Sequence, residues 1–311
     1  WSSDVCSSDL ITIPDGVISI GKGAFSGCTS LISATISDSV ISIGGSAFSN
    51  CSALTDVKLS ENMSSIEGDT FRWCKSLESI VITSRVVSIG DYAFDECSNL
   101  TNISIPVGVT SIGGHAFSAC SSLKEISLPD SVSNINGSTF QDCSNLSSIK
   151  IPEKVTTIGG SAFEGCTGLV SIEIPEKMTQ IESYAFRSCY RLKEVVFNGT
   201  IEKWKTIKIS DWYNGNDYLK TAVIHCNDGN ITWTSDNGWS NVPETENSIE
   251  VGQTSASGST LHAVFNGLTE GESYAVIVSK SATDPFAAGN LIYVNQKTAD
   301  VNGVLDVPFV P

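Results

Sequence analysis

Hydrophobic and polar positions between residues 11 and 197 repeat with a period of 23 residues. Each period holds a short run in which apolar and polar residues alternate, and alternation predicts a β-strand with one buried face. A fixed period of this length indicates a solenoid, because each coil can bury its apolar side chains only against its neighbours. Three residue types keep the interval through eight repeats without an insertion or deletion: Phe25, Phe48, Phe71, Phe94, Phe117, Phe140, Phe163 and Phe186; Cys28, Cys51, Cys74, Cys97, Cys120, Cys143, Cys166 and Cys189; and Leu31, Leu54, Leu77, Leu100, Leu123, Leu146, Leu169 and Leu192.

One repeat shows how the pattern predicts a coil. Residues 123–128 read Leu-Lys-Glu-Ile-Ser-Leu, which is the Leu-x-x-Leu-x-Leu core of a leucine-rich repeat. Pro129 follows, where a residue without an amide donor can end the strand. Val132 and Ile135 then turn inward, before the phenylalanine and cysteine complete the interior. We therefore predict a β-rich leucine-rich-repeat solenoid whose short strands stack in a parallel ladder.

A second recurring feature follows the last inward pair of each coil. This position is mostly glycine or asparagine, which tolerate a left-handed backbone, so we expect a left-handed turn there. The residue before each phenylalanine is alanine or threonine, which indicates room for only a small side chain. The turn position reads Gly21, Gly44, Glu67, Gly90, Gly113, Asn136, Gly159 and Glu182.

The pattern fails upstream of residue 11. The cysteine expected at position 5 lies at Cys6, and the leucine expected at position 8 is Ser8. The string Asp4-Val-Cys-Ser-Ser-Asp-Leu10 also matches the translation of a common sequencing-library adapter. We predict that residues 1–10 are a non-native segment, and that a signal sequence and an anchor lie outside the given ends. An irregular N-terminal cap is the alternative.

The pattern also changes after Leu192. We expect the solenoid to span 11–197 and a C-terminal cap to span 198–233, since a solenoid needs its last coil shielded. Residues 234–247 contain Asp, Asn, Gly and Pro and read as a linker. Residues 248–311 hold short apolar runs separated by turn signals, which predict a small all-β, sandwich-like domain.

The repeat unit resembles a known family. Leu-x-x-Ile-x-Ile-Pro-x-x-Val-x-x-Ile-Gly-x-x-Ala-Phe-x-x-Cys is similar to the BspA-like leucine-rich repeats of bacterial and some protist surface proteins, over residues 11 to about 232. The resemblance implies a secreted or cell-surface location, and binding to host or neighbouring-cell surface proteins, to matrix, or to glycans. It transfers no site residues, because the shared positions all belong to the core.

Composition and charge limit the possible partners. The chain has 311 residues, a formal net charge of −16 and only 17% charged residues. An acidic chain repels phosphate backbones and anionic headgroups, so nucleic acid is not an expected partner. The sequence has no apolar run long enough for a membrane span, so we expect no membrane insertion in this fragment.

The cysteine column allows three interpretations. Neighbouring coils would place its members about 5 Å apart, which permits disulfides between them. However, the side chains would point in parallel from a core phase, where cysteine behaves as a small buried hydrophobe. Free buried thiols are therefore favoured over disulfides and over a metal site, and no Cys-x-x-Cys pair occurs. We expect no cofactor and no metal.

Catalytic residues are not evident. His115, His225 and His262 are isolated from one another, and no hydrolase, zinc-protease or nucleotide-binding motif occurs. We therefore expect no enzyme.

Aromatic residues gather in the predicted cap. Trp212, Tyr213 and Tyr218 lie beside amides such as Asn214. Flat rings beside amides can stack on a sugar and hydrogen-bond its hydroxyl groups, so these four residues are candidate ligand contacts. The competing interpretation, which we favour, is that the rings cover the open end of the solenoid.

The outward strand positions are polar, for example Asn102 and Ser104, Glu125 and Ser127, or Ser148 and Lys150. They carry no aromatic stripe, and specific interfaces usually use Tyr, Trp or Arg anchors. Binding by this face would be weak per module and multivalent, unless the face is simply solvated. The sequence thus favours a non-catalytic binding or adhesion module. The alternative is a structural stalk or a carbohydrate-binding appendage of a larger surface protein.

Overall fold

The computed structural model describes residues 8–210, 215–235 and 238–242, and the backbone of five strands beyond them. It divides into two compact units, Trp1–Val242 and Pro243–Pro311. Each unit is described separately below.

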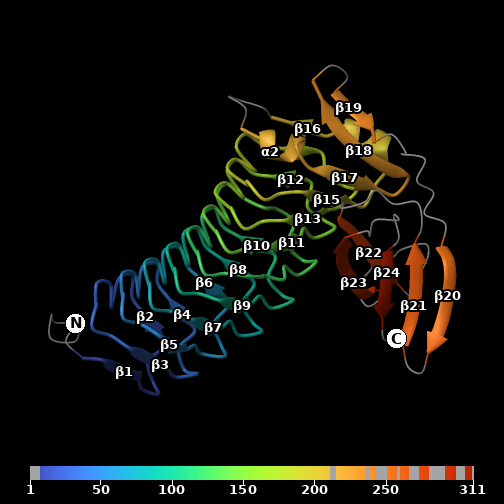
Figure 1. Ribbon diagram of the computed structural model, residues 1–311. Helices are drawn as coiled ribbons and strands as arrows, with labels where there is room; N and C mark the ends of the chain where they lie inside the picture. The colour runs from blue at the N-terminus through green and yellow to red at the C-terminus, as the bar shows by residue number, and fades with distance from the viewer. Residues whose placement is uncertain are drawn as a thin grey trace. The chain divides into compact units, whose positions relative to one another are not determined.

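The first unit is a stack of coils that advances steadily along the chain (Figure 1). Every coil contributes one segment to each of two parallel ladders. The first ladder contains β1 (Leu10–Ile13), β3 (Ser33–Ile36), β5 (Asp56–Lys58), β7 (Ser79–Val81), β9 (Asn102–Ser104), β11 (Ser148–Lys150), β13 (Ser171–Ile174) and β15 (Glu194–Phe197). The second contains β2 (Ser19–Ile20), β4 (Ser42–Ile43), β6 (Ser65–Ile66), β8 (Ser88–Ile89), β10 (Ser111–Ile112), β12 (Thr157–Ile158) and β14 (Gln180–Ile181).

The repeat period sets the register of both ladders. Ile149 pairs with Ile172, and Ile172 pairs with Val195, each one repeat along the chain. Because all strands share the same phase, inward side chains stack on inward side chains and the core continues through the whole stack. The predicted parallel leucine-rich-repeat solenoid is confirmed.

Phenylalanine rings form the axis of the core. Phe117 is fully buried, and its ring centroid lies 5.5 Å from that of Phe94 and 5.7 Å from that of Phe140, with interplanar angles of 0° and 5°. The backbone N–H of Phe117 donates to the carbonyl of Thr139 in the next coil, at 2.9 Å. Each coil is thus joined to the next by both ring packing and a hydrogen bond.

The glycines expected in left-handed turns serve a different purpose. Gly44, Gly90, Gly113 and Gly159 do not have positive φ. A Cβ on Gly113 would instead lie 2.4 Å from the backbone nitrogen of Asp91 in the preceding coil. The left-handed turn prediction was therefore wrong. At these four positions glycine leaves room for the backbone of the preceding coil, whereas other coils carry glutamate or asparagine at the same phase.

Left-handed backbone occurs at two other phases of the coil. One phase lies two residues before each phenylalanine and the other lies just before each cysteine. Gly23 and Gly27 occupy these phases in the first coil, but later coils place other residues there, each at a cost of about 1 kcal/mol relative to glycine. These are Ser46, Asn50, Asp69, Trp73, Tyr92, Glu96, His115, Ala119, Ser138, Asp142, Ser161, Tyr184 and Ser188, with φ between 53° and 63°.

The cap extends both ladders and then ends them. β16 (Lys208–Ile209) pairs with β14, and β17 (Val223–Cys226) pairs with β15, both in parallel. β18 (Gly229–Thr234) and β19 (Gly238–Asn241) then add antiparallel strands to the first ladder. Helix α1 (Ile201–Lys205) places Trp204 fully within the core, and α2 (Asp217–Lys220) places Leu219 there.

Two boundaries differ from those expected. Residues 234–247 were predicted to be a linker, but β19 lies within this range, so the cap reaches Val242. β19 belongs to the cap because it pairs with β18 as a hairpin. No local sequence signal distinguishes residues 238–241 from a loop. At the other end, β1 already includes Leu10, which pairs with Ser33. Most of residues 1–10 lie outside the described part of the chain, so their non-native origin stays a prediction.

The second unit is built from antiparallel strands, as the alternating runs predicted. β20 (Val251–Ser257), β21 (Thr260–Phe265) and β24 (Leu305–Phe309) form one sheet. β22 (Ser273–Ser279) and β23 (Leu291–Thr298) form another. Sandwich packing depends on side chains that lie outside the described residues, so it stays a prediction.

Candidate functional site: a hollow in the first ladder

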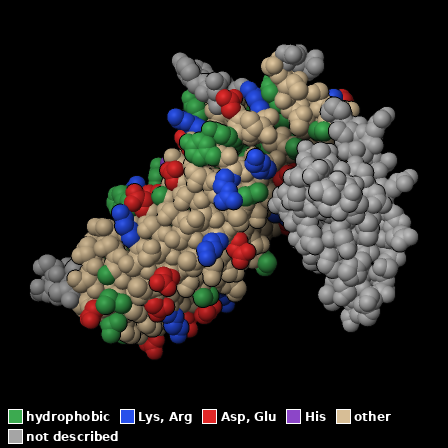
Figure 2. Space-filling view, viewed as in Figure 1, with side chains coloured by type: hydrophobic (Ala, Val, Ile, Leu, Met, Phe, Trp, Pro, Cys, Tyr) green, Lys and Arg blue, Asp and Glu red, His purple; other side chains and the backbone are tan. Residues whose placement is uncertain are grey.

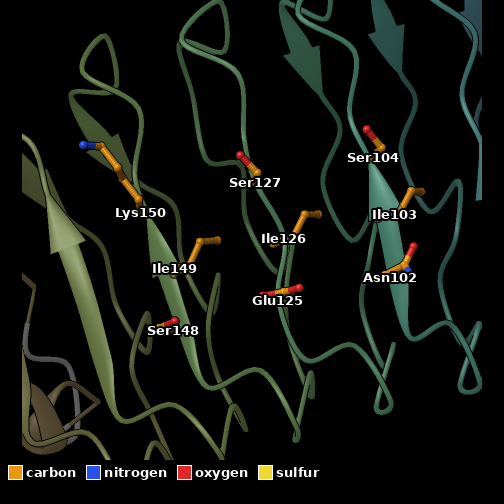
Figure 3. Close-up of a pocket in the computed structure, with 9 residues that line it drawn as sticks. All are labelled: Asn102, Ile103, Ser104, Glu125, Ile126, Ser127, Ser148, Ile149 and Lys150. Carbon is orange, nitrogen blue, oxygen red and sulfur yellow. The ribbon is translucent and has the colours of Figure 1, made fainter. Parts of the chain in front are cut away.

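A hollow of about 500 Å³ lies in the strand face of the first ladder, between β9 and β11. Three consecutive coils line it, and each contributes a polar–isoleucine–polar triplet (Figure 3). Ile103, Ile126 and Ile149 are buried and give the lining its apolar part. The flanking side chains are all exposed: Asn102, Ser104, Glu125, Ser127, Ser148 and Lys150.

The ladder is interrupted at the hollow, and it is also unpaired between β5 and β7. The middle triplet, Glu125–Ser127, is not part of a strand, and its pairing is reduced to one isolated bridge between Ser104 and Ser127. No strand pairing joins this triplet to β11 in the described structure. By comparison, β13 and β15 pair over four residues. The peptide groups of Glu125–Ser127 therefore take part in less ladder pairing than those of a regular strand.

Charged side chains on one side of the hollow hold one another in place. Lys150 Nζ lies 2.7 Å from Glu173 Oε1, and this hydrogen bond raises the pKa of Lys150. Asn198 Nδ2 donates to Glu173 Oε1 at 3.0 Å and to Glu153 Oε1 at 3.1 Å. Lysine, arginine and carboxylate side chains are interspersed over the visible face of the solenoid, without a broad region of one sign (Figure 2). The surroundings of the hollow therefore favour polar recognition.

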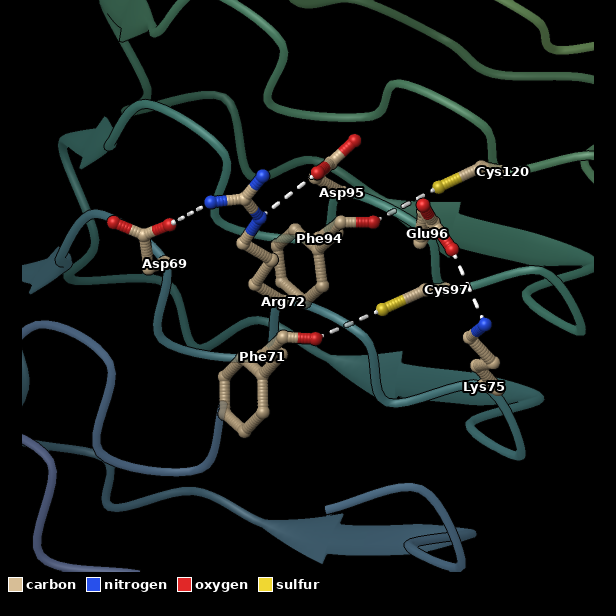
Figure 4. A network of polar contacts seen from close by, with 9 residues as sticks. All are labelled: Asp69, Phe71, Arg72, Lys75, Phe94, Asp95, Glu96, Cys97 and Cys120. Carbon is tan, nitrogen blue, oxygen red and sulfur yellow. Dashed lines mark hydrogen bonds and ion pairs between the residues drawn. The ribbon is translucent and has the colours of Figure 1, made fainter. Parts of the chain in front are cut away.

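The cysteine column lies inside the solenoid. Cys51 to Cys189 are free and fully buried. Each thiol donates to the carbonyl of a phenylalanine in the preceding coil: Cys97 Sγ to Phe71 at 3.1 Å, and Cys120 Sγ to Phe94 at 3.2 Å (Figure 4). Burial raises the pKa of Cys51 and of Cys189 to about 12, so these thiols stay protonated. Cys28 differs from the expected free thiol, because it is disulfide-bonded.

The two described histidines contact different neighbours. His115 stacks on Tyr92, with ring centroids 4.5 Å apart. His225 Nδ1 lies 2.9 Å from Asn230 Oδ1, and Nε2 contacts Glu194 Oε2. Among the described side chains, no cluster of three or more His, Cys, Asp or Glu residues could hold a metal ion. His262 lies in β21, and its side chain is outside the described residues.

The predicted ligand contacts in the cap are only partly described. Trp212, Tyr213 and Asn214 lie outside the described residues. Tyr218 packs partly against the core, and its ring meets that of Tyr190 edge-on at 5.0 Å. The role of these four residues as ligand contacts stays a prediction.

Other tryptophans pack in the described part of the cap. Trp204 contacts Phe197 and Trp239 edge-on, at centroid distances of 5.2 and 5.6 Å. Trp233 stands against Trp239 at 5.4 Å and is 39% exposed. The buried rings cover the end of the solenoid, whereas Trp233 presents part of its surface to solvent.

Sequence reasoning identified the outward residues around the hollow but not the hollow itself. The segment 123–128 has the same apolar pattern as the coils on either side, so no local signal marks the interruption.

Comparisons with known proteins agree with this architecture. The sequence model of the family described as "BspA type Leucine rich repeat region (6 copies)" matches residues 4–121 and 87–207. No curated protein matches the chain. A leucine-rich repeat protein from Bacteroides ovatus is similar in structure, with 29% identity and a TM-score of 0.60, over 70% of this chain and 63% of its own. The chain thus spans less than two thirds of that protein.

Two further solved structures are similar over parts of the chain. A T. pallidum leucine-rich repeat protein is 31% identical over 52% of this chain and 78% of its own, with a TM-score of 0.49. A leucine-rich cell surface protein from Faecalibacterium prausnitzii is 24% identical over 65% of this chain and 90% of its own, with a TM-score of 0.34. Within the described residues, no helix has the length and apolarity needed to cross a membrane.

Proposed function

Because the chain belongs to the BspA-type leucine-rich-repeat family, we propose that it is a non-catalytic binding module of a secreted or cell-surface protein. Its partners are proteins of a host, of a neighbouring cell or of the extracellular matrix. The hollow between β9 and β11 is the contact site. Support comes from the interrupted ladder, since a folded scaffold that leaves peptide groups outside regular ladder pairing beside buried isoleucines offers both hydrogen bonds and apolar surface.

An extended segment of the partner fits this site best. Such a segment can add main-chain hydrogen bonds to the peptide groups around Ile126, while polar residues at the rim select its side chains. The rim lacks aromatic anchors, so the affinity of one module is low and repeated copies raise it.

A bulky substitution at Ser127 tests the site without touching the core. Ser127→Trp fills the hollow and should weaken retention on immobilised matrix proteins or whole cells roughly tenfold, as loss of an interface centre does. Val81→Trp is the matched control, because Val81 occupies the same phase outside the hollow and is 76% exposed. Equal loss in both variants, or no retention of the intact chain, contradicts the proposal.

A glycan-binding role at the cap is the second candidate. The partly exposed ring of Trp233, with Lys220 Nζ 5.1 Å from its centroid, gives a flat surface next to a hydrogen-bond donor. Glycan-array binding that is lost in Trp233→Ala or Trp212→Ala, with the fold retained, would support this role. If the chain binds neither glycans nor proteins, a role as a structural stalk is the remaining candidate.

A further inference from the structure

Four planar side chains stack on the turn side of the solenoid, away from both strand ladders. The guanidinium of Arg72 lies 4.2 Å from the ring centroid of Trp73 and 4.7 Å from that of Tyr92. The ring of Tyr92 in turn stacks on His115 at 4.5 Å, with an interplanar angle of 10°. All four are half-buried, so part of each reaches solvent. We call this set the Trp73–His115 stack.

Ion pairs fix the guanidinium at the centre of the stack. Arg72 Nε donates to Asp95 Oδ2 at 2.9 Å, and Arg72 Nη1 donates to Asp69 Oδ1 at 3.1 Å (Figure 4). Asp95 is nearly buried, with only 9% of its side chain exposed. A planar surface held from two directions loses little conformational freedom on binding, which favours its use in recognition.

The backbone at these positions is costly for large side chains. Trp73 and Tyr92 have φ values of 61° and 58°, in phases where Gly23 and Gly27 occur without strain. Glycine or asparagine would suit the turn better, as at Asn50. Positive φ recurs at these phases throughout the stack, so the turn tolerates but does not require the large rings of Trp73 and Tyr92.

The half-buried ring of Trp73 is the part of the stack that a partner would contact. Arg72 covers one face of the Trp73 ring, and no other ring or cation stacks on Trp73 among the described residues. Carboxylates outnumber cations around it, four to two, so the surface favours a positive ligand. These are Asp69, Asp91, Asp95 and Glu96, against Arg72 and Lys75.

We propose that the Trp73–His115 stack is a second interaction surface, which binds an arginine-bearing, basic segment of a partner protein. A guanidinium of the partner stacks on Trp73, and the net negative charge around the stack attracts it. Arginine suits this surface better than lysine, because its planar group both stacks and donates in a fixed fork. This surface supplies the Tyr, Trp and Arg anchors that the strand face lacks.

Binding of a labelled peptide to the full chain tests the proposal. A short fluorescein-labelled peptide of alternating arginine and serine should bind saturably at physiological salt, measured by fluorescence anisotropy. Trp73→Gly and Tyr92→Gly should each weaken binding roughly tenfold, as loss of an anchor does. Neither substitution changes the net charge, so this loss separates ring stacking from general attraction to an acidic protein.

Matched variants keep the outcome unambiguous. Tyr184 has φ of 63° in the same phase as Tyr92, so Tyr184→Gly changes the backbone in the same way and should leave binding unchanged. Trp73→Asn replaces Trp73→Gly if the latter unfolds. Ser127→Trp should bind the peptide normally, which separates this surface from the hollow. Equal affinity in Trp73→Gly and Tyr184→Gly, equal binding of a lysine–serine peptide, or no saturable binding by the intact chain overturns the proposal.

Discussion

The backbone N–H of Phe186 donates to Asn216 Oδ1 at 3.0 Å. In earlier coils the same phenylalanine N–H donates to a carbonyl of the following coil, as Phe163 does to Ala185 at 2.8 Å. The side-chain amide oxygen of Asn216 therefore replaces the carbonyl that a following coil would supply. Its Nδ2 also donates to the carbonyls of Glu182 and Ser210, so one buried side chain satisfies three backbone groups at the end of the stack.

Removing this amide should destabilise the cap. Asn216→Ala removes the acceptor of the buried Phe186 N–H and the donor to two part-buried carbonyls, of which that of Glu182 keeps a hydrogen bond from Ala185. An unsatisfied buried group costs about 1–3 kcal/mol. We expect a loss of roughly 3 kcal/mol in the free energy of unfolding, with faster hydrogen exchange at the Phe186 amide. Asn227→Ala is the control, because Asn227 is exposed and its Nδ2 donates only one exposed hydrogen bond, to the carbonyl of Asn198. It should cost no more than about 1 kcal/mol. Similar stability of the two variants would show that Asn216 does not cap the stack.

The central phenylalanines should act locally. Phe117→Ala removes a fully buried ring from between two others and should lower the free energy of unfolding by about 3–5 kcal/mol. Because coils contact only their neighbours, hydrogen exchange should increase chiefly around residues 94–140. Uniform loss of protection along the solenoid would contradict this one-dimensional behaviour.

Two glycines of the same phase should respond in opposite ways to alanine. Gly113→Ala forces a Cβ to within 2.4 Å of the Asp91 nitrogen and should cost about 1–3 kcal/mol, as overpacking does. Gly21→Ala meets nothing within 4 Å, so it should be neutral or stabilise by up to about 1 kcal/mol through the unfolded state. Chemical denaturation gives the unfolding free energy of both variants. Equal changes would show that close approach of the coils is not the reason for glycine at position 113.

Alkaline pH should weaken the solenoid through its cysteines. The thiols of Cys51 and Cys189 have pKa values raised from 9.0 to about 12 by burial. The thiols of unfolded chains ionise near pH 9, so the stability that protonated burial provides is complete below that pH and is lost as pH rises towards 12. Each such thiol contributes a slope of about 1.4 kcal/mol per pH unit in that window.

One substitution isolates the share of a single thiol. Burial also raises the pKa of Cys97 well above 9.0. Cys97→Ala should therefore show a shallower decline in unfolding free energy between pH 9 and 11, even if the variant is less stable at pH 7. Parallel pH profiles of the variant and the parent chain would show that ionisation of this thiol is not linked to folding.

The sequence by itself determined the solenoid, its register and its core. A constant interval of 23 residues puts each apolar phase above the same phase of the previous coil, so Phe117 can only meet Phe94 and Phe140. The outward residues around Ile126 also followed from alternation. Such features depend on the order of residues within one coil and on the repeat interval, and both can be read from the sequence.

Tertiary structure decided where the repetition is broken. Pairing is missing at Glu125–Ser127, although this segment has the same apolar pattern as its neighbours. Stacking of Trp73, Tyr92 and His115 depends on two left-handed turns that meet only across coils. Asn216 reaches Phe186 because the cap folds back over an end that would otherwise present unpaired peptide groups. Each of these features involves residues from different coils, and no local sequence pattern around them marks it. Only the folded structure brings these groups together.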